Sequence, residues 1–235
     1  MEVLRDSKIV GNLDTNFLKI IAIISMTFDH FGKEFFPDII ILQVIGRIAF
    51  PIFAYCIVVG CLYTSDFKKY IQRLLVFGVL SQPIYILSSF PNWNEFIENF
   101  WVLNIFFTLI LGAIAIKSLE QKKWIIFFVD IITVCMFNFD YGIYGIIVML
   151  IFYMFRNNYI MAIIVSTLYM SIPFFTSNDV SLLGFSFGLQ GFAVFALIPI
   201  FCKTNFNFKI NKYFFYVYYP AHFFLIFIIR MLNYA

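Results

Sequence analysis

The sequence predicts an all-α protein that crosses a membrane many times, organised as a single domain over residues 1–235. Three features of its composition predict this class. Of the residues, 63% are hydrophobic and only 12% are charged, whereas about a quarter of a soluble domain is charged. There are 34 Phe residues, and the mean hydropathy is +0.92. In water such a chain would expose too much apolar surface, so we expect it to lie in a lipid bilayer.

The apolar residues fall into segments long enough to cross a bilayer, which takes roughly 17–25 residues of helix. Ile and Phe dominate them and would favour strands in water, but in lipid the backbone must satisfy its own hydrogen bonds as a helix. We expect about nine transmembrane helices, within a range of eight to ten. The sixth is short, and residues 139–176 can be divided differently. The predicted segments are 17–36, 39–63, 70–90, 100–118, 123–139, 141–155, 158–176, 182–202 and 212–233.

The loops between these segments differ in charge, and this predicts the orientation of the chain. Lys and Arg in short loops favour the cytoplasmic side. With a cytoplasmic N-terminus, the basic loops near 68–69, 117–123, 156 and 203–212 share that side, and acidic loops near 95–98 and 179 lie opposite. We therefore expect a multi-pass protein of the inner or plasma membrane. The net charge is +3, and the Lys and Arg residues are spread along the chain without a basic block. No nucleic-acid partner is therefore expected.

Several polar side chains lie inside the predicted spans, where they need an explanation. A charge at mid-bilayer costs about 2.5–3.5 kcal/mol on insertion scales, so such groups usually face a bundle interior or a wet cavity. Their alternative role is a structural ion pair or a polar contact between helices, above all for the lone Asp130. The residues are Lys19, Asp29, His30, Glu34, Arg47, Asn104, Asp130 and His222.

Helical geometry relates the polar residues of the first segment to one another. Eleven residues separate Lys19 from His30, which places both on one face about 16 Å apart. Asp29 points about 100° away from His30, and Glu34 is one turn beyond His30, within reach of its imidazole. Pro51 lies four residues after a charged position, and a proline there frees a backbone carbonyl, as in helices that line intramembrane cavities.

The residue types limit the chemistry. Motifs of serine hydrolases, P-loop proteins and zinc peptidases are absent from the sequence, and the four Cys lie in apolar runs without C-x-x-C spacing, so no metal is expected. Histidine accepts a proton near neutral pH, and arginine or asparagine can bind an anion or a developing oxyanion. This set suits group transfer to a hydroxyl or an amine, and it suits a proton-coupled transporter equally well.

Blocks of sequence along nearly the whole chain, from Leu18 to His222, resemble the TraX family of conjugal-transfer proteins associated with F-pilin acetylation. The resemblance rests on the order and spacing of the blocks, because any one apolar helix resembles another by composition. The blocks are LKIIAIISMTFDHFGKEFFPD (18–38), LQVIGRIAFPIFAY (42–55), KKYIQRLLVFGVLSQPIY (68–85), LNIFFTLILG (103–112), DYGIYGI (140–146) and YFFYVYYPAH (213–222).

The resemblance implies a relation to multispanning membrane acyltransferases that use cytoplasmic acetyl-CoA. Those proteins carry a basic residue, ten further residues and a histidine in the first helix, and Lys19 and His30 match that spacing, with lysine where arginine is usual. The DH, GR, LN, DYG and P-x-H positions of the family map onto Asp29–His30, Gly46–Arg47, Leu103–Asn104, Asp140–Gly142 and Pro220–His222.

From the chemistry and the depth of these residues we assign expected roles. His30 is the expected catalytic base, with Asp29 or Glu34 orienting it. The expected ligands of substrate or acetyl-CoA are Lys19, Arg47, Asn104, Asp140, Tyr144 and His222. The structural alternatives are a buried pair with Asp29 for Arg47, a tight turn for residues 140–144 and an interfacial position for His222.

The expected function is that of a membrane-bound acyltransferase that moves acetyl from cytoplasmic acetyl-CoA to a hydroxyl or an amine of an exported peptide, pilin or glycan. A proton-coupled transporter is one alternative, although the sequence lacks the two related halves that many transporters have. A non-enzymatic membrane protein of envelope assembly is another, although it would not need His30 and Arg47 in the membrane.

Overall fold

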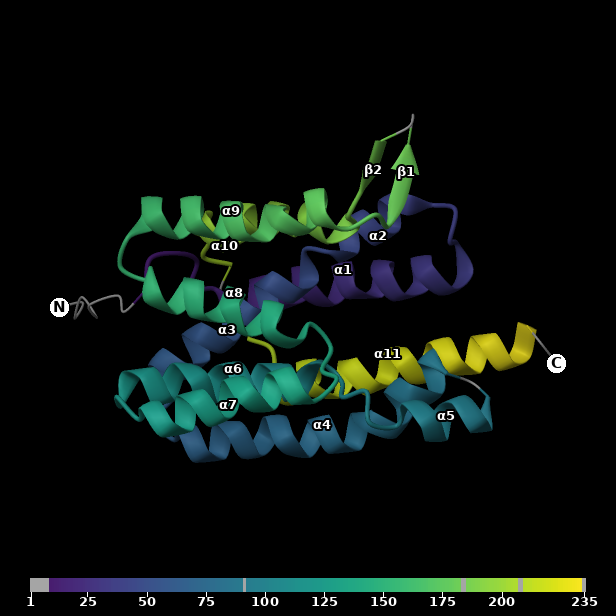
Figure 1. The fold of residues 1–235 in the computed structure, drawn as a ribbon, viewed down its shortest axis with the longest axis horizontal. Coiled ribbons are helices and arrows are strands. Elements are labelled where there is room, and N and C mark those ends of the chain that lie inside the picture. The colour runs from purple at the N-terminus through teal and green to yellow at the C-terminus, as the bar shows by residue number, and fades with distance from the viewer. Residues whose placement is uncertain (1–8, 91, 183–184, 207–208, 234–235) are drawn as a thin grey trace.

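A computed structural model describes residues 9–90, 92–182, 185–206 and 209–233, and nearly all of its regular structure is helical (Figure 1). Within the described residues, the one sheet is a short antiparallel hairpin of β1 and β2 that pairs Val180 with Phe187. The helices are α1 Thr15–Phe35, α2 Ile40–Gly46, α3 Ala49–Tyr63, α4 Phe67–Ser89, α5 Trp93–Asn99, α6 Ile105–Glu120, α7 Trp124–Met136, α8 Gly142–Met154, α9 Tyr159–Thr176, the 3-10 helix η1 Leu189–Ala196, α10 Leu197–Phe201 and α11 Lys212–Asn233; the strands are β1 Val180–Leu182 and β2 Phe185–Phe187.

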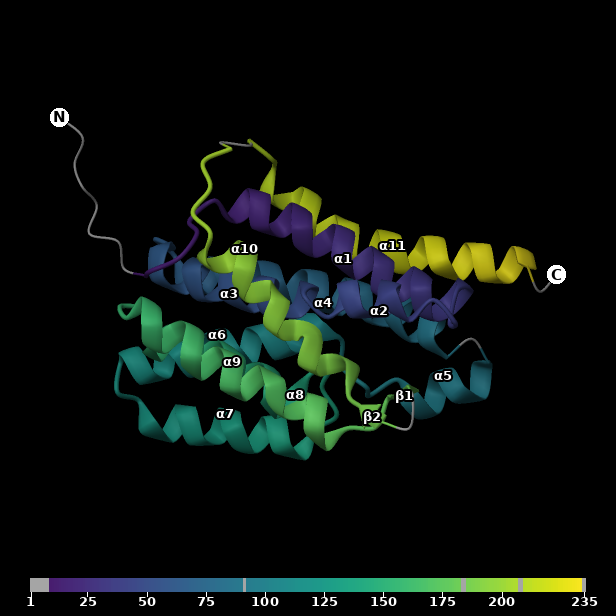
Figure 2. The same cartoon turned by 90° about the horizontal axis from the view of Figure 1, so that it is seen from above.

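The long helices run along a common axis, so their connections gather at two ends of the bundle (Figures 1 and 2). The α6–α7 and α8–α9 turns lie at one end. The β1–β2 hairpin, α5 and the end of α11 lie at the other. The first end carries basic residues in its turns and the second carries Glu95 and Glu98 on α5. The predicted cytoplasmic N-terminus falls outside the described residues.

Seven of the nine predicted segments each correspond to one helix whose ends lie within a few residues of the prediction, as for α9 and α11. The number of membrane crossings is not confirmed. In the described residues, four helices are long and apolar enough to cross a membrane, and three further apolar helices are shorter. The four are Ile40–Tyr63, Phe67–Ser89, Tyr159–Thr176 and Lys212–Leu232.

The predicted helix at 182–202 is wrong in its first part. Leu182 ends strand β1, Phe185–Phe187 form strand β2, and the helical part begins only at η1. Two glycines let η1 approach α9: a Cβ on Gly188 would lie 2.1 Å from the carbonyl oxygen of Pro173, and one on Gly191 would lie 2.4 Å from the Cβ of Phe174. Hydropathy reports how apolar the segment is, but it carries no signal for this close contact.

The predicted helix at 39–63 is interrupted at residues 47 and 48, between α2 and α3. Immediately before the break, Gly46 packs against α1, where a Cβ would lie 2.2 Å from the Cβ of Asp29. A larger side chain would push the two helices apart. The glycine therefore brings the end of α2 against the C-terminal half of α1, and it places Arg47 beside Asp29.

Candidate active site

A cavity of about 600 Å³ runs between α1, α3, α4, α6 and α11. On α1 its lining extends from Thr15 to Lys33, which corresponds to about 27 Å of helix at 1.5 Å per residue. The cavity therefore follows most of the length of the bundle. Lys19 and His30 both line it, and so does Asp29, which lies between them in the chain.

One end of the cavity is cationic. Lys19 of α1, Arg73 of α4 and Lys212 of α11 all line it there. The Lys19 ammonium lies 5.4 Å from the centre of the Phe215 ring, and the Arg73 guanidinium lies 5.7 Å from that of Tyr70. The Nε of Arg73 is buried and has no hydrogen-bond partner among the described residues. Three cations with few acidic neighbours favour a polyanionic ligand.

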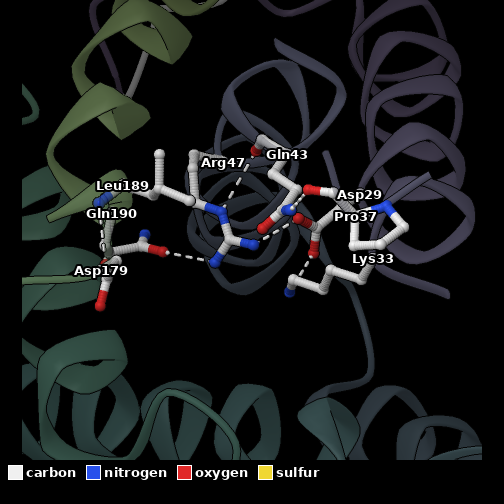
Figure 3. Close-up of polar contacts among 8 residues, drawn as sticks. All are labelled: Asp29, Lys33, Pro37, Gln43, Arg47, Asp179, Leu189 and Gln190. Carbon is white, nitrogen blue, oxygen red and sulfur yellow. Dashed lines mark hydrogen bonds and ion pairs between the residues drawn. The ribbon is translucent and has the colours of Figure 1, made fainter. Parts of the chain in front are cut away.

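Towards the other end, Asp29 pairs with two cations at once, and we call these three residues the ion triad (Figure 3). One carboxylate oxygen of Asp29 accepts from Arg47 and the other from Lys33 Nζ at 2.7 Å. Arg47 also donates through Nε to the carbonyl of Gln43 at 3.3 Å and through Nη1 to Gln190 at 3.3 Å. The buried pair that was the structural alternative for Arg47 is therefore present.

Arg47 and Lys33 also line a second, more open pocket of about 520 Å³ beside the β1–β2 hairpin. Its wall includes Asp179, whose carboxylate accepts from the backbone N–H of Leu189 at 2.8 Å. Figure 3 shows Asp179 and Gln190 on one side of Arg47 and Asp29 on the other. The ion triad thus forms the wall between the long cavity and this outer pocket.

The two histidines of the chain meet at the α1–α11 contact. The ring centres of His30 and His222 are 5.2 Å apart, and Phe223 packs against both, at 4.6 Å from His30 and 4.2 Å from His222. His222 is 4% exposed and lies behind the cavity wall that His30 lines. The predicted interfacial alternative for His222 does not fit this burial.

Neither neighbouring carboxylate is bound to His30. Both oxygens of Asp29 are taken up in the ion triad. Glu34 instead accepts from Arg230 Nε of α11 at 2.9 Å, and Arg230 also donates to the carbonyl of Ser88 at 2.9 Å. The expectation that Glu34 holds the imidazole is wrong, because this long-range pair joins the ends of α1 and α11 instead.

Asn104 lies outside the cavity lining and fastens α4 to α6. It caps α6 by accepting from the N–H of Phe106 at 3.1 Å, and its amide donates at 2.8 Å to both Gly78 O and Gln82 Oε1. Gln82 in turn donates to the carbonyls of residues 100 and 102. The oxygen and the amide nitrogen of the Asn104 side chain are thus both hydrogen-bonded within the fold, which leaves neither to bind the predicted ligand.

The Asn104→Ala variant is expected to lower the free energy of unfolding by about 3 kcal/mol, because it removes a helix cap and two buried side-chain hydrogen bonds, to Gln82 and to the Gly78 carbonyl. Thermal unfolding in detergent measures this loss. The matched control is Asn99→Ala, which removes an exposed bond to the Glu95 carbonyl and should change stability by less than about 0.5 kcal/mol. A stable Asn104→Ala protein that binds its ligand weakly would restore the ligand role.

The DYG segment forms a turn that closes one wall of the cavity. Tyr141 has a left-handed backbone with φ of 62°, and Gly142 follows with φ of 40°, a combination that is rare without glycine. The Tyr141 ring stacks on Phe50 at 3.9 Å. Asp140 also lines the cavity, and loss of hydration there raises the pKa of its carboxyl to about 6.

The LN and DYG segments meet, although 36 residues separate them in the chain. The backbone N–H of Asp140 donates to the carbonyl of Leu103 at 2.9 Å, and the hydroxyl of Thr108 donates to the Asp140 carbonyl. Tyr144 lies one turn further along α8, outside the cavity lining, with its ring stacked on Tyr169 at 5.4 Å. Asp140 is therefore a residue of the cavity wall, and Tyr144 supports that wall from behind.

Sequence reasoning missed several residues of the site. Arg73 and Lys212 lie near the ends of predicted helices, where lysine and arginine are commonly interfacial anchors, and Gln190 and Lys33 carry no pattern of their own. The available signal for Arg73 was its position three residues inside an apolar segment.

Asp130 is buried on α7 and lies outside the cavity lining. Among the described residues, no group of three or more His, Cys, Asp or Glu is arranged to hold a metal ion.

Comparisons with known proteins find one family and two relatives that resemble this chain. The model of a family described as TraX protein matches residues 14–230. A relative from Dichelobacter nodosus, named as probable fimbrial assembly protein FimC of serogroup H1, is 31% identical over 144 residues, which is 57% of this chain and 59% of the relative. An uncharacterized protein, RP591, from Rickettsia prowazekii (strain Madrid E) is 34% identical over 107 residues, or 44% of this chain and 38% of its own length. The matches thus span less than two thirds of either relative. No solved structure matches the chain significantly.

Proposed function

Because this chain belongs to the TraX family, we propose that it is a membrane acyltransferase that moves acetyl from acetyl-CoA to a hydroxyl or an amine of an exported peptide, pilin or glycan. The observation that carries the proposal is the long cavity. It joins a cationic end at Lys19 to a histidine and then to an ion triad at the opposite end. This order matches a polyanionic donor, a base and an acceptor site along one path.

The cationic end suits the phosphates of the coenzyme. Arginine and lysine bind phosphate through charge-assisted hydrogen bonds, and the buried Nε of Arg73 lacks a partner within the described chain. His30 lies eleven residues along α1 from Lys19, about 16 Å away. A pantetheine arm held at that end would extend along the cavity and bring the thioester towards His30.

His30 is the proposed base. Its imidazole takes the proton from the acceptor hydroxyl or amine as the acceptor atom attacks the thioester carbonyl. The carbon–sulfur bond then breaks, the coenzyme leaves as a thiolate, and the proton on His30 passes to that sulfur. Acetyl is transferred with no net loss of a proton. The cation of Arg47 and the hydroxyls of Tyr141 and Tyr219, which also line the cavity, are available to stabilise the oxyanion.

The acceptor is proposed to enter through the outer pocket beside the β1–β2 hairpin, because Lys33 and Arg47 line both spaces. With nine spans and a cytoplasmic N-terminus in the cell membrane, this pocket would face outwards and the cationic end would face the cytoplasm. The name of the Dichelobacter relative, a probable fimbrial assembly protein, favours a surface-fibre subunit among the acceptors.

The proposal is tested with the full-length protein in lipid nanodiscs, radiolabelled acetyl-CoA and an envelope extract from cells that lack the gene. Label is expected to move to protein or glycan in the extract, and mass spectrometry should show the same acetyl groups in envelopes of parental cells but not of deleted cells. Identical acetylation in both strains, with no transfer in nanodiscs, would reject the proposal. Proton movement across vesicles without transfer would instead identify a transporter.

Arg73→Gln should raise the KM for acetyl-CoA about tenfold, because one charge-assisted hydrogen bond contributes roughly 1.5–3 kcal/mol, and it should leave the KM for the acceptor unchanged. The matched control is Lys69→Gln on the same helix, because Lys69 is exposed and pairs with Asp66 outside the cavity. Initial rates over a range of acetyl-CoA concentrations measure the effect. Equal changes in the two variants would mean that Arg73 does not contact the coenzyme.

A further inference from the structure

His222 has one ring nitrogen that the fold leaves without a partner. Its Nδ1 lies 3.2 Å from the carbonyl oxygen of Tyr218. A carbonyl can only accept a hydrogen bond, so Nδ1 carries the hydrogen. In the neutral ring Nε2 then has a free lone pair, and this buried atom has no hydrogen-bond partner among the described residues. A buried acceptor in that position needs a donor.

The other histidine, which has a ring hydrogen to offer, lies beside this atom's ring. The ring centres of His30 and His222 are 5.2 Å apart, a separation that a small ring rotation or one bridging water closes. No hydrogen bond joins either ring nitrogen of His30 to another described residue. The stacked Tyr218 ring and the Phe223 ring hold the His222 imidazole on its two neighbouring sides, so the orientation of Nε2 is constrained.

The usual partner of a catalytic histidine is a carboxylate, and none is available here. Asp29 is saturated by Arg47 and Lys33, and Glu34 is bound to Arg230. The remaining acidic residue of the cavity wall, Asp140, lies in the α7–α8 turn and makes no hydrogen bond or ion pair with either histidine. His222 is the group left beside His30 that can accept its hydrogen.

We propose that His222 is the positioning residue of this site: its Nε2 accepts the ring hydrogen of His30, directly or through one water, and so presents the other His30 nitrogen, unprotonated, to the cavity. The hydrogen bond between the two histidines is inferred from the geometry alone, and only its effect on catalysis rests on the proposed function. While His30 holds the acceptor's proton as an imidazolium, its second N–H donates to Nε2 of His222. That bond strengthens when His30 is charged, and His222 itself neither gains nor loses a proton.

The first test does not depend on activity. Full-length protein labelled with ¹⁵N at histidine contains only two imidazoles, so nitrogen NMR in nanodiscs resolves the tautomer of each. In the parental protein His30 is expected in one tautomer. In His222→Phe it should populate both, whereas His222→Gln, whose carbonyl can accept, should restore one. Phe224→Leu changes an exposed ring on the same helix and is the matched control, with His30 expected to stay in one tautomer. A single His30 tautomer in His222→Phe would overturn the inference.

The second test is kinetic, and the two possible roles predict opposite orders. If His222 acts as an acceptor, kcat falls about tenfold in His222→Phe and less in His222→Gln, with the KM of both substrates unchanged. If the ring only packs, Phe should preserve kcat better than Gln, which would reject the positioning role. A raised KM would also reject it, in favour of a ligand contact. If even the parental protein transfers no acetyl, the proposed function fails, and the tautomer measurement still decides the inference.

Discussion

His30→Gln is expected to reduce acetyl transfer by about 10²–10⁴-fold, the range that a positioned acid–base group contributes. Glutamine has a similar size and can hydrogen-bond, but it cannot take a proton from the acceptor. The neighbouring imidazole of His222 lies behind the cavity lining and is bound through Nδ1 to the Tyr218 carbonyl, so it does not take the place of His30 in the cavity. Single-turnover transfer from labelled acetyl-CoA in nanodiscs measures the loss.

The control for this variant separates catalysis from folding. Met26→Leu lies one turn earlier on α1 and also lines the cavity. This volume-conserving change should cost less than about 1.5 kcal/mol of stability and leave the rate near the parental value. The His30→Gln protein must also bind acetyl-CoA and unfold near the parental temperature. A well-folded His30→Gln protein that transfers acetyl at the parental rate would show that another group is the base.

Asp29→Asn is expected to be the most destabilising of the polar substitutions, because it leaves Arg47 and Lys33 without their shared carboxylate. Removing one partner of a buried ion pair costs about 3–5 kcal/mol. For a chain of this length, such a loss corresponds to a fall of about 10 °C in the unfolding midpoint. Thermal unfolding in nanodiscs, followed by circular dichroism, measures the shift.

A double-mutant cycle separates the two halves of the ion triad. The Lys33 side chain is 44% exposed and that of Arg47 is 13% exposed, so Lys33 can return to water when Asp29 is lost. Lys33→Gln alone should therefore cost about 1 kcal/mol or less. The double variant Asp29→Asn, Arg47→Gln should be more stable than Asp29→Asn alone. If the two changes simply add, the pair is not coupled and the cost of Asp29→Asn has another origin.

The helices could be predicted where the physical signal is local. The length of the apolar segments and the polar residues at their ends predicted α9 and α11, because a bilayer imposes a minimum helix length and polar residues gather in the turns. The segment at 182–202 failed because an apolar hairpin followed by a 3-10 helix has the same hydropathy as a helix. What distinguishes it is the contact of Gly188 and Gly191 with α9, and this is a tertiary contact.

The candidate site could also be predicted only where the signal is local. The shared face of Lys19 and His30 follows from the period of one helix, and the structure places both in one cavity. The pair of Arg47 with Asp29 was the structural alternative that the sequence offered, and Lys33 lies one helical turn from Asp29. The partner of Glu34 could not be predicted, because Arg230 lies far away in the chain, on α11. In the sequence, Asn104 lies in an apolar segment, as a ligand-binding asparagine would. Only its contacts with Gln82 and Gly78 reveal its structural role.

The length of the cavity has a consequence for what must cross the lipid. Taking a charged group to the middle of a bilayer is costly, and coenzyme A carries several phosphate charges. A path of about 27 Å along α1 between Thr15 and Lys33 allows the charged nucleotide to stay at the entrance beside Lys19 while only the neutral acetyl end advances. In the proposed reaction, the protein therefore exports a two-carbon unit and returns its carrier to the side from which it came.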